Sequence, residues 1–511
     1  MKLILLLVFA LSANADSDIN SRLQSLCDAT DLSGSTCPFF ISHEILSQLV
    51  FRIKADGANG LWTSTPYAGI WWQSGQGFWY ITEYLNTMAS RTTDLLYFGI
   101  RWAGETTSDN HNQYVATGFL DDQAWWGNGG LRMVDYIRST GDYGPQKLTN
   151  SAVAVKNDNQ LHSDANCSGG VYWEYKTPSK NTISNVLTME LESHLFAING
   201  DISMLTAPNK LGSIDLYNWM LDIRELVEET GEQFDTIDSR TCEVTGGPLD
   251  YEYGVLLQGL VHLYEATDDQ HYLDQARIFA DKALSMWMDP RTKVYKNNCE
   301  TCTNLDLVAF KGTFFLGLSR LYDETKNQTY ADMFINTFKA MVEQSTRFNQ
   351  TVDDGAEYFV TDYINGDYGH VQKDDFYTIS LFNNLALTTA ALKVFQNTYP
   401  TVHDRLDLTI NGLLTYSRQQ STPYLMCICN DFGCPLGHTQ QCFTQAGHHD
   451  LRAEVTEKSD AFLVAPNHKV TFWDNSGTFA GQTGFLSSSG WIMPQGWANR
   501  TQSLNIDYYS D

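Results

Sequence analysis

The chain has 511 residues, of which 43% are hydrophobic, so it is long enough to bury a large core. Its formal net charge of −27 argues against nucleic acid as a partner, because binding to phosphates requires clusters of Lys and Arg. An excess of acidic residues favours a soluble protein, and it does not discriminate among uncharged ligands.

The N-terminus has the pattern of a secretory signal peptide. Lys2 precedes an apolar run over residues 3–11, and small residues follow at positions 13–15. The run is shorter than the roughly 18 residues that a spanning helix needs. We therefore predict a signal peptide over residues 1–15, a mature protein that begins near Asp16, and a secreted, extracellular location without a membrane span.

Two features agree with export. The polar C-terminal residues 499–511 lack the hydrophobic tail of a GPI signal, which favours a freely secreted protein. Acceptor patterns for N-glycosylation stand at Asn166, Asn327, Asn349 and Asn499.

The segment 118–136, GFLDDQAWWGNGGLRMVDY, carries the strongest signal for chemistry. Asp121 and Asp122 are adjacent at a predicted helix start, and Trp125 and Trp126 lie four residues later on the same helix faces. Adjacent carboxyls suit a retaining glycosidase, which needs them about 5 to 5.5 Å apart, better than an inverting one, which needs roughly 6.5 to 9.5 Å. Helix capping by the aspartates and core packing by the tryptophans are the structural alternatives.

The region after residue 250 contains an internal repeat. The segment GVLLQGLVHLYEATDDQHYLDQA from Gly254 aligns without gaps on GTFFLGLSRLYDETKNQTYADMF from Gly312. Each copy predicts a helix, a short polar turn and a second helix, and less regular copies begin near Ile70, Asn185 and Leu381. Stacked helical hairpins that close on themselves give a toroid. An open solenoid is the alternative, and the glycine-rich helix starts favour the crowded centre of a closed ring.

Ten cysteines follow the leader, and an even number in an exported protein predicts disulfides. A local pair of Cys27 with Cys37 fits this reading, but the connectivity does not follow from the sequence. Zinc binding is the alternative at two places, Cys299-x-x-Cys302 and the group around His438. The segment from Cys427 to His449 reads as a cysteine-rich insertion over about residues 425–450. The cysteines are Cys27, Cys37, Cys167, Cys242, Cys299, Cys302, Cys427, Cys429, Cys434 and Cys442.

Together with the Asp-Asp segment, several motifs resemble those of glycoside hydrolase family 76, the endo-α-1,6-mannanases and their fungal cell-wall relatives. In chain order they are CSGGVYW at 167–173, KNTISN at 180–185, LDYEYGVLLQG at 249–259, FKG at 310–312 and GQTG at 481–484. The resemblance spans roughly residues 60 to 490. It departs from the family pattern at Glu252, where the family usually has Asn, and Asp250 adds a further carboxyl nearby.

The resemblance implies an all-α fold, an (α/α)6 barrel of six helical hairpins, formed by a single domain over residues 16–511. It places the N-termini of the inner helices at the rim of the barrel where the substrate binds. The aspartates become the catalytic pair, and the aromatic candidates for a sugar platform are Trp71, Trp72, Trp125, Trp126 and Trp173. Further candidates for binding substrate or fixing the rim are Lys180, Asn185, Tyr251, Glu252 and Lys311. For the two lysines, the alternative is a structural ion pair or an ordinary surface side chain with an exposed stem.

By the same resemblance, Asp121 attacks the anomeric carbon, and Asp122 protonates the leaving oxygen and then activates the acceptor. Like charges at close range separate the two pKa values, as this division of roles requires. The expected substrate is an α-mannan, cleaved at α-1,6 linkages by a monomer without metal or organic cofactor. The alternatives are a transglycosylase that moves mannan or GPI-glycan chains, a non-catalytic glycan-binding protein, and a polysaccharide lyase, whose acidic substrate the negative chain would repel.

Overall fold

The structure is a computed structural model. It describes most of residues 71–88, 118–140, 145–296, 305–348 and 374–398, a few residues around these ranges, and short strands between 426 and 508. The predicted leader, the start of the mature chain and the cysteines at 27, 37, 299, 302 and 434 lie outside the described residues, as do His438 and the sequons at Asn349 and Asn499.

The chain divides into two compact units. One comprises residues 20–89 and 103–400, and the other comprises residues 1–19, 90–102 and 401–511. The single domain predicted over residues 16–511 includes parts of both units. In the following, the first is called the helical unit and the second the β unit.

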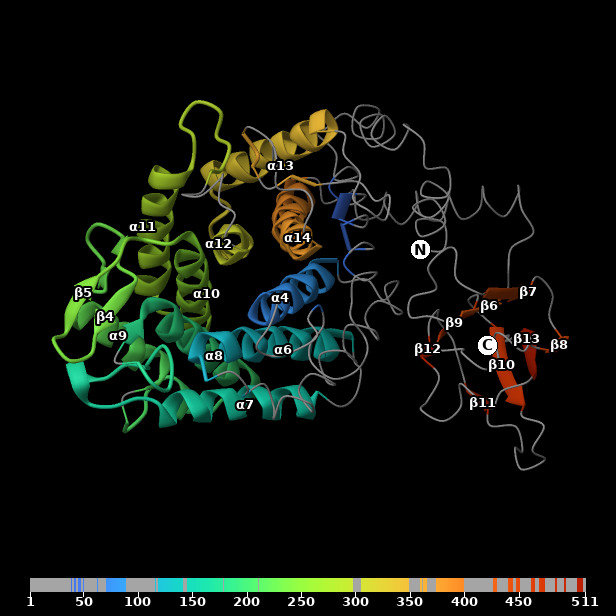
Figure 1. Cartoon of the computed structure of the whole chain (residues 1–511), viewed down its shortest axis with the longest axis horizontal. Coiled ribbons are helices and arrows are strands. Elements are labelled where there is room, and N and C mark those ends of the chain that lie inside the picture. Colours follow the sequence, from blue (N-terminus) through green and yellow to red (C-terminus); the bar gives the residue numbers. More distant parts are fainter. Residues whose placement is uncertain are drawn as a thin grey trace. The chain divides into compact units, whose positions relative to one another are not determined.

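Six helices of the helical unit form a closed ring (Figure 1). Each inner helix packs against the next in chain order, and the last packs against the first, which confirms the predicted (α/α)6 barrel and not the open solenoid. The inner helices are α4 (Trp71–Met88), α6 (Leu120–Thr140), α8 (Thr182–Asn199), α10 (Asp250–Thr267), α12 (Leu305–Thr325) and α14 (Asp374–Thr398). The described outer helices are α7 (Gln146–Leu161), α9 (Ser213–Asp222), α11 (Gln270–Trp287) and α13 (Gln328–Phe348).

Inner and outer helices differ in how their residues are buried. In α8 every residue from Thr182 to Leu195 is buried, and in α10 every residue from Asp250 to Leu263. In α11 the buried residues, such as Tyr272, Ala276, Phe279 and Ala283, recur every three or four positions and make one apolar stripe. The inner helices are therefore enclosed by protein, whereas α11 covers the barrel with one face.

The repeat identified in the sequence corresponds to the hairpins α10–α11 and α12–α13. Asp268 and Lys326, which occupy equivalent positions in the two copies, both have positive φ and end the inner helix in the same way. A Cβ on Gly254 would lie 2.4 Å from the carbonyl oxygen of Thr313, and one on Gly317 would lie 2.0 Å from the oxygen of Gly254. Helices α10 and α12 therefore contact each other through backbone atoms at these glycines, which agrees with the predicted crowded centre of a closed ring.

Two small sheets lie beside the first turns of α8 and α10. Strands β1 (Ser179–Asn181), β4 (Thr236–Asp238) and β5 (Glu243–Thr245) pair antiparallel in the order β1-β4-β5, and β2 (Leu226–Val227) pairs with β3 (Glu232–Gln233). A disulfide between Cys167 and Cys242 joins the loop before β1 to the turn between β4 and β5. It confirms the predicted disulfide chemistry for these two cysteines.

The β unit contains two antiparallel four-stranded sheets, ordered β11-β10-β13-β8 and β12-β9-β6-β7. The predicted insertion at 425–450 covers its strands β6 to β8, and Cys427 stands opposite Cys442 in the pairing of β6 with β7. Thr483 and Gly484 of the motif GQTG form β11 in this unit, and the first two residues of the motif lie outside the described residues. The strands are β6 (Met426–Cys429), β7 (Gln440–Phe443), β8 (Gly447–Asp450), β9 (Ala461–Val464), β10 (His468–Trp473), β11 (Thr483–Gly484), β12 (Trp491–Ile492) and β13 (Ser503–Tyr508).

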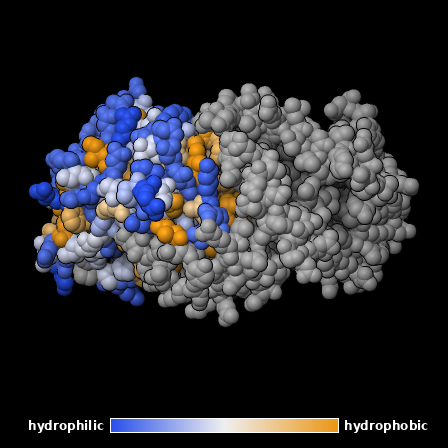
Figure 2. Space-filling model, turned by 90° about the horizontal axis from the view of Figure 1, so that it is seen from above, coloured by the Kyte–Doolittle hydropathy of each residue, from blue (hydrophilic) through white to orange (hydrophobic). Residues whose placement is uncertain are grey.

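The described surface agrees with the acidic composition. Figure 2 shows a predominantly hydrophilic face on which hydrophobic residues form separate patches. Among the helices that the structure describes, none is both long enough and apolar enough to span a bilayer.

Candidate active site

The catalytic candidates lie at the entrance to helix α6. Asp121 and Asp122 occupy its first turn, and the preceding residues pair with the segment that contains Trp173. The amide of Leu120 donates to the carbonyl of Trp173 at 2.9 Å, and the amide of Tyr175 donates to the carbonyl of Gly118 at 3.0 Å. This pairing fixes the start of α6 against the CSGGVYW segment, which the sequence analysis had singled out separately.

Asp121 is half-buried and hydrogen-bonded to that segment. The indole Nε1 of Trp173 donates to its Oδ2 at 3.2 Å. Burial raises the pKa of Asp121 to about 7; the Trp173 bond opposes this rise, and the negative charge of Asp235 adds to it. Asp122 is the adjacent residue, so a pKa near neutrality at Asp121 lets this segment hold one proton at about pH 7. One proton on two carboxyls is the ionisation that a double displacement requires.

Four aromatic rings from four inner helices form a layer beside the aspartates, called here the aromatic floor. Tyr251 stacks on Phe310 with centroids 3.8 Å apart and planes 4° apart. Trp125 stacks on Tyr251 at 6.2 Å, and Trp72 lies 5.9 Å from Trp125. Trp125 is buried beneath its neighbours, whereas Trp72 keeps an exposed part and donates through Nε1 to Asp306 at 3.1 Å.

Three of the five candidate tryptophans are buried, namely Trp125, described above, Trp126 and Trp71. Trp126 has no exposed surface and Trp71 only 3%, and their rings pack 5.7 Å apart. For Trp126 and Trp71 the structure agrees with core packing, the alternative to a sugar platform. Adjacent residues on a helix point about 100° apart, so only one member of each Trp-Trp pair is able to face the aromatic floor.

Lys180 and Asn185 hold the loop that carries Trp173. The buried Lys180 ammonium donates to Asp164 Oδ1 at 2.9 Å and to the carbonyls of Asn166 at 2.9 Å and Gly169 at 2.5 Å. Asn185 accepts from the amide of Val171 at 2.8 Å and donates to its carbonyl at 3.2 Å. Both side chains are fully buried, so they fix the rim instead of contacting substrate.

Lys311 belongs to a buried cluster with Asp250. Its ammonium lies 4.7 Å from the ring centre of Tyr363, and its side chain is 1% exposed. Burial raises the pKa of Asp250 to about 6, against the bond from the Tyr295 hydroxyl at 2.6 Å and the charge of Lys311. Like Lys180, Lys311 is buried among groups of the protein, which agrees with a structural role for its charge.

The structure adds two carboxyl groups that the sequence analysis did not identify, Asp235 and Glu225. Both act electrostatically on Glu252, which is completely buried and accepts a hydrogen bond from Gln233 Nε2 at 2.6 Å. Burial and Asp235 raise the pKa of Glu252 well above its usual range. The residues between β2 and β4 carry no recognisable motif, and only the tertiary fold brings them to α10.

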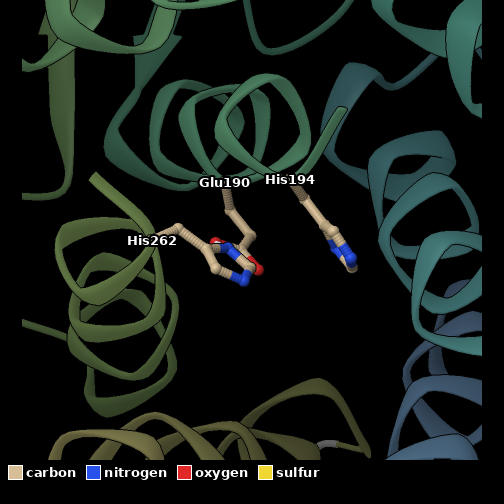
Figure 3. A group of neighbouring side chains, drawn as sticks. All are labelled: Glu190, His194 and His262. Carbon is tan, nitrogen blue, oxygen red and sulfur yellow. The ribbon is translucent and has the colours of Figure 1, made fainter. Parts of the chain in front are cut away.

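A second polar cluster lies in the second halves of the inner helices. Figure 3 shows Glu190 and His194 on α8 and His262 on α10, and their potential ligand atoms lie within 4.8 Å of one another. Both oxygens of Glu190 are engaged, by Arg132 Nη2 at 2.9 Å and by His262 Nδ1 at 2.7 Å. The guanidinium stays protonated and already supplies the positive charge, so this cluster fits an ion-pair network better than a metal site.

Comparison with known proteins assigns the family. The model of glycosyl hydrolase family 76 matches residues 50–397. The mannan endo-1,6-alpha-mannosidase DFG5 of Saccharomyces cerevisiae is 24% identical over 353 residues, 64% of this chain and 70% of that protein. DFG5 of Candida albicans is 27% identical over 299 residues, 54% of this chain and 63% of that protein.

Solved structures share the fold of the helical unit. The GH76A alpha-1,6-mannanase of Salegentibacter sp. HEL1_6 superposes with a TM-score of 0.55 at 19% identity, covering 69% of this chain and 98% of that one. Dfg5 of Chaetomium thermophilum gives 0.55 at 16% identity, covering 69% of this chain and 89% of that one. The match of the family model covers the whole described barrel except the last residue of α14, so the chain belongs to glycosyl hydrolase family 76.

Proposed function

We propose that the protein is a secreted, retaining endo-α-1,6-mannosidase and that the helical unit is its catalytic domain. The observation that carries the proposal is the consecutive pair Asp121 and Asp122 at the barrel entrance, beside Trp173 and the aromatic floor. An inactive variant of the Salegentibacter alpha-1,6-mannanase, described in complex with alpha-1,6-mannotriose, has two consecutive aspartates replaced by Asn. Together with the mannan endo-1,6-alpha-mannosidases among its relatives, this supports an α-1,6-mannan as substrate.

In the proposed mechanism, Asp121 attacks the anomeric carbon while Asp122 gives its proton to the glycosidic oxygen. The bond between that carbon and the leaving oxygen breaks, and a covalent mannosyl ester with Asp121 forms. Asp122 then takes a proton from water, whose oxygen attacks the same carbon and releases Asp121 as a carboxylate. Two inversions give a product with the α configuration, and the Trp173 indole keeps Asp121 oriented throughout.

The aromatic floor supports the binding of a neutral sugar. Trp72 and Trp173 keep exposed parts beside the aspartates, and apolar ring faces suit the C–H faces of mannose. Trp125, Tyr251 and Phe310 pack behind Trp72 and limit its rotation. We assign substrate contact to Trp72, Trp173 and the edge of Tyr251, and support to Trp125 and Phe310.

The test compares Asp121→Asn and Asp122→Asn with Asp222→Asn, an exposed residue at the end of α9. Each catalytic variant is expected to lose about 10² to 10⁴ in turnover on α-1,6-mannan and to remain folded, because acid–base assistance alone contributes that much. The Asp222 variant should match the wild type. If both catalytic variants keep more than about a tenth of the activity, the assignment fails.

Product analysis separates the alternative functions. Incubation with α-1,6-mannan should release oligosaccharides whose first anomer, observed by NMR, is α, and a first β anomer would show direct attack by water. Transfer of mannan to an added acceptor sugar in preference to hydrolysis would instead establish the transglycosylase, and binding without turnover would establish a glycan-binding protein. A polyuronate serves as the control substrate for the lyase alternative.

Export has its own test. Expressed in a eukaryotic host, the protein is expected in the medium, with an N-terminus near Asp16 and no free thiols. Retention in the membrane fraction would contradict free secretion.

A further inference from the structure

A second pair of carboxyl groups stands behind the catalytic aspartates. Glu252 lies in the first turn of α10, and Asp235 lies between β3 and β4. The Asp235 carboxyl lies within hydrogen-bonding range of Glu252, whose Oε1 is buried without another partner. The amide of Gln233 holds the second oxygen, because its Nε2 donates to Oε2 at 2.6 Å. Two carboxyls joined by a hydrogen bond need one proton between them.

The surroundings place that proton on Glu252. Its side chain has no exposed surface, whereas Asp235 is half-buried. The charged groups that act on Glu252 are Asp235, in the β3–β4 connection, and Glu225, just before β2. Within α10, the charge of an ionised Glu252 would also act on the hydroxyl groups of Tyr251 and Tyr253. These groups are acidic, so an ionised Glu252 would be a buried anion among other acids.

Asp235 connects this pair to the catalytic site. Its charge acts on both Asp121 and Tyr251, so it lies near the proposed nucleophile and the aromatic floor. The hydroxyl of Thr236 donates to Asp235 Oδ2 at 2.8 Å. Gly246 packs closely on the other side, where a Cβ would lie only 2.8 Å from that of Asp235. Thr236 and Gly246 therefore limit the movement of the Asp235 side chain, and Glu252 adds a further contact.

We propose that Glu252 is a positioning residue that acts as a neutral carboxylic acid: its hydroxyl donates to Asp235 and fixes that carboxylate within electrostatic range of Asp121. Ionisation of Glu252 removes this donor, adds a second negative charge and sets an alkaline limit to activity. The effect on turnover rests on the proposed function. The raised pKa of Glu252 agrees with the neutral form.

Glu252→Gln tests the proposal, because glutamine reproduces the neutral acid at every pH. Its amide oxygen accepts from Gln233 and its NH₂ group donates to Asp235. We expect kcat/KM at about pH 5 to stay within about threefold of the wild type, and activity to persist at higher pH where the wild type declines. Glu252→Ala, which removes the donor, should lose about tenfold or more at every pH and should not be rescued by acid.

A stability measurement provides a readout without substrate. A carboxyl whose pKa is raised in the folded state contributes stability that is fully present below its unfolded pKa and is lost as the pH rises through the folded pKa. The Tm of the wild type should therefore fall more steeply than that of Glu252→Gln between about pH 5 and pH 9.

Two results would overturn the proposal. One is superimposable dependence of Tm on pH in the wild type and Glu252→Gln. The other is a Glu252→Gln enzyme as impaired as Glu252→Ala, with an unchanged pH profile. Absence of mannan cleavage by the wild type would instead refute the proposed function, and the Tm comparison would still decide whether Glu252 holds the proton.

Discussion

At the scale of single residues, the contact between Trp173 and Asp121 controls the ionisation of the proposed nucleophile. The indole N–H donates to the carboxylate, and this bond opposes the rise in pKa that burial imposes. A donor to a carboxylate favours its charged form. The sequence motif around Trp173 therefore has an electrostatic role in addition to any contact with sugar.

Replacement of Trp173 by Phe keeps an aromatic ring and removes the donor. The pKa of Asp121 should rise further, so the acid limb of the profile of kcat/KM against pH should move to higher pH, because the nucleophile must be ionised to attack. The profile on α-1,6-mannan measures this shift. A lower rate at every pH with an unmoved acid limb would show that the indole acts only by contact with substrate.

The residues found from the sequence are those whose role is encoded in local spacing. Asp121 and Asp122 stand at a helix start as predicted, because cap preference and helical periodicity are local properties. Which of two adjacent tryptophans faces the core depends on the neighbouring helix, so the sequence left core packing open for Trp126. Asp235 and Glu225 lie in irregular segments, and no local pattern connects them to α10.

At the scale of elements, the repeat predicted paired helices that the structure contains, whereas the strands after residue 425 were not predicted. The inner helices are long and strongly patterned, and such elements are the most predictable from sequence. Strands β11 and β12 have only two residues each, too few for an alternating pattern to be recognised. The charged residues inside the barrel were also missed, since each looks like an isolated surface charge in its own helix.

Contacts of those charged residues link each of the six inner helices to a neighbouring one. Arg132 of α6 lies 2.9 Å from Glu190 of α8 and 3.9 Å from Glu83 of α4. Glu190 in turn accepts from His262 of α10. The remaining links are Glu265 of α10 with Arg320 of α12 at 2.7 Å, and Lys393 of α14 with Asp323 of α12 at 3.0 Å and with Glu83 at 2.8 Å.

Arg132→Met removes a positive charge from this network, so Glu190 and Glu83 each lose one ion-pair partner. Breaking one partner of a buried ion pair costs about 3–5 kcal/mol of unfolding free energy, because the remaining charge is uncompensated. Arg138→Met, at an exposed site on the same helix, should change the free energy by no more than about 0.5 kcal/mol. Urea unfolding measures both. Equal effects of the two variants would contradict a stabilising role for the network.

At the scale of the whole molecule, several of the described carboxyl groups are buried without enough positive charge nearby to offset the cost of burial. Burial raises the pKa of Asp250 to about 6, of Asp121 to about 7 and of Glu192 to about 8. Asp135 is an exception, because His194 and then Arg132 hold its pKa at about 2 despite burial. The net charge of −27 adds repulsion that grows as further carboxyls ionise.

These shifts predict a protein that is most stable in mildly acidic solution. The contribution of a group with a raised folded pKa is lost as the pH rises through that pKa, so Tm should decline between about pH 5 and pH 8. The contribution of Asp135, whose folded pKa is depressed, is lost as the pH falls towards about 2, so Tm should also decline below about pH 4. Calorimetry at constant ionic strength measures the profile. A maximum at or above neutral pH would mean that the carboxyls raised by burial do not dominate the folding equilibrium.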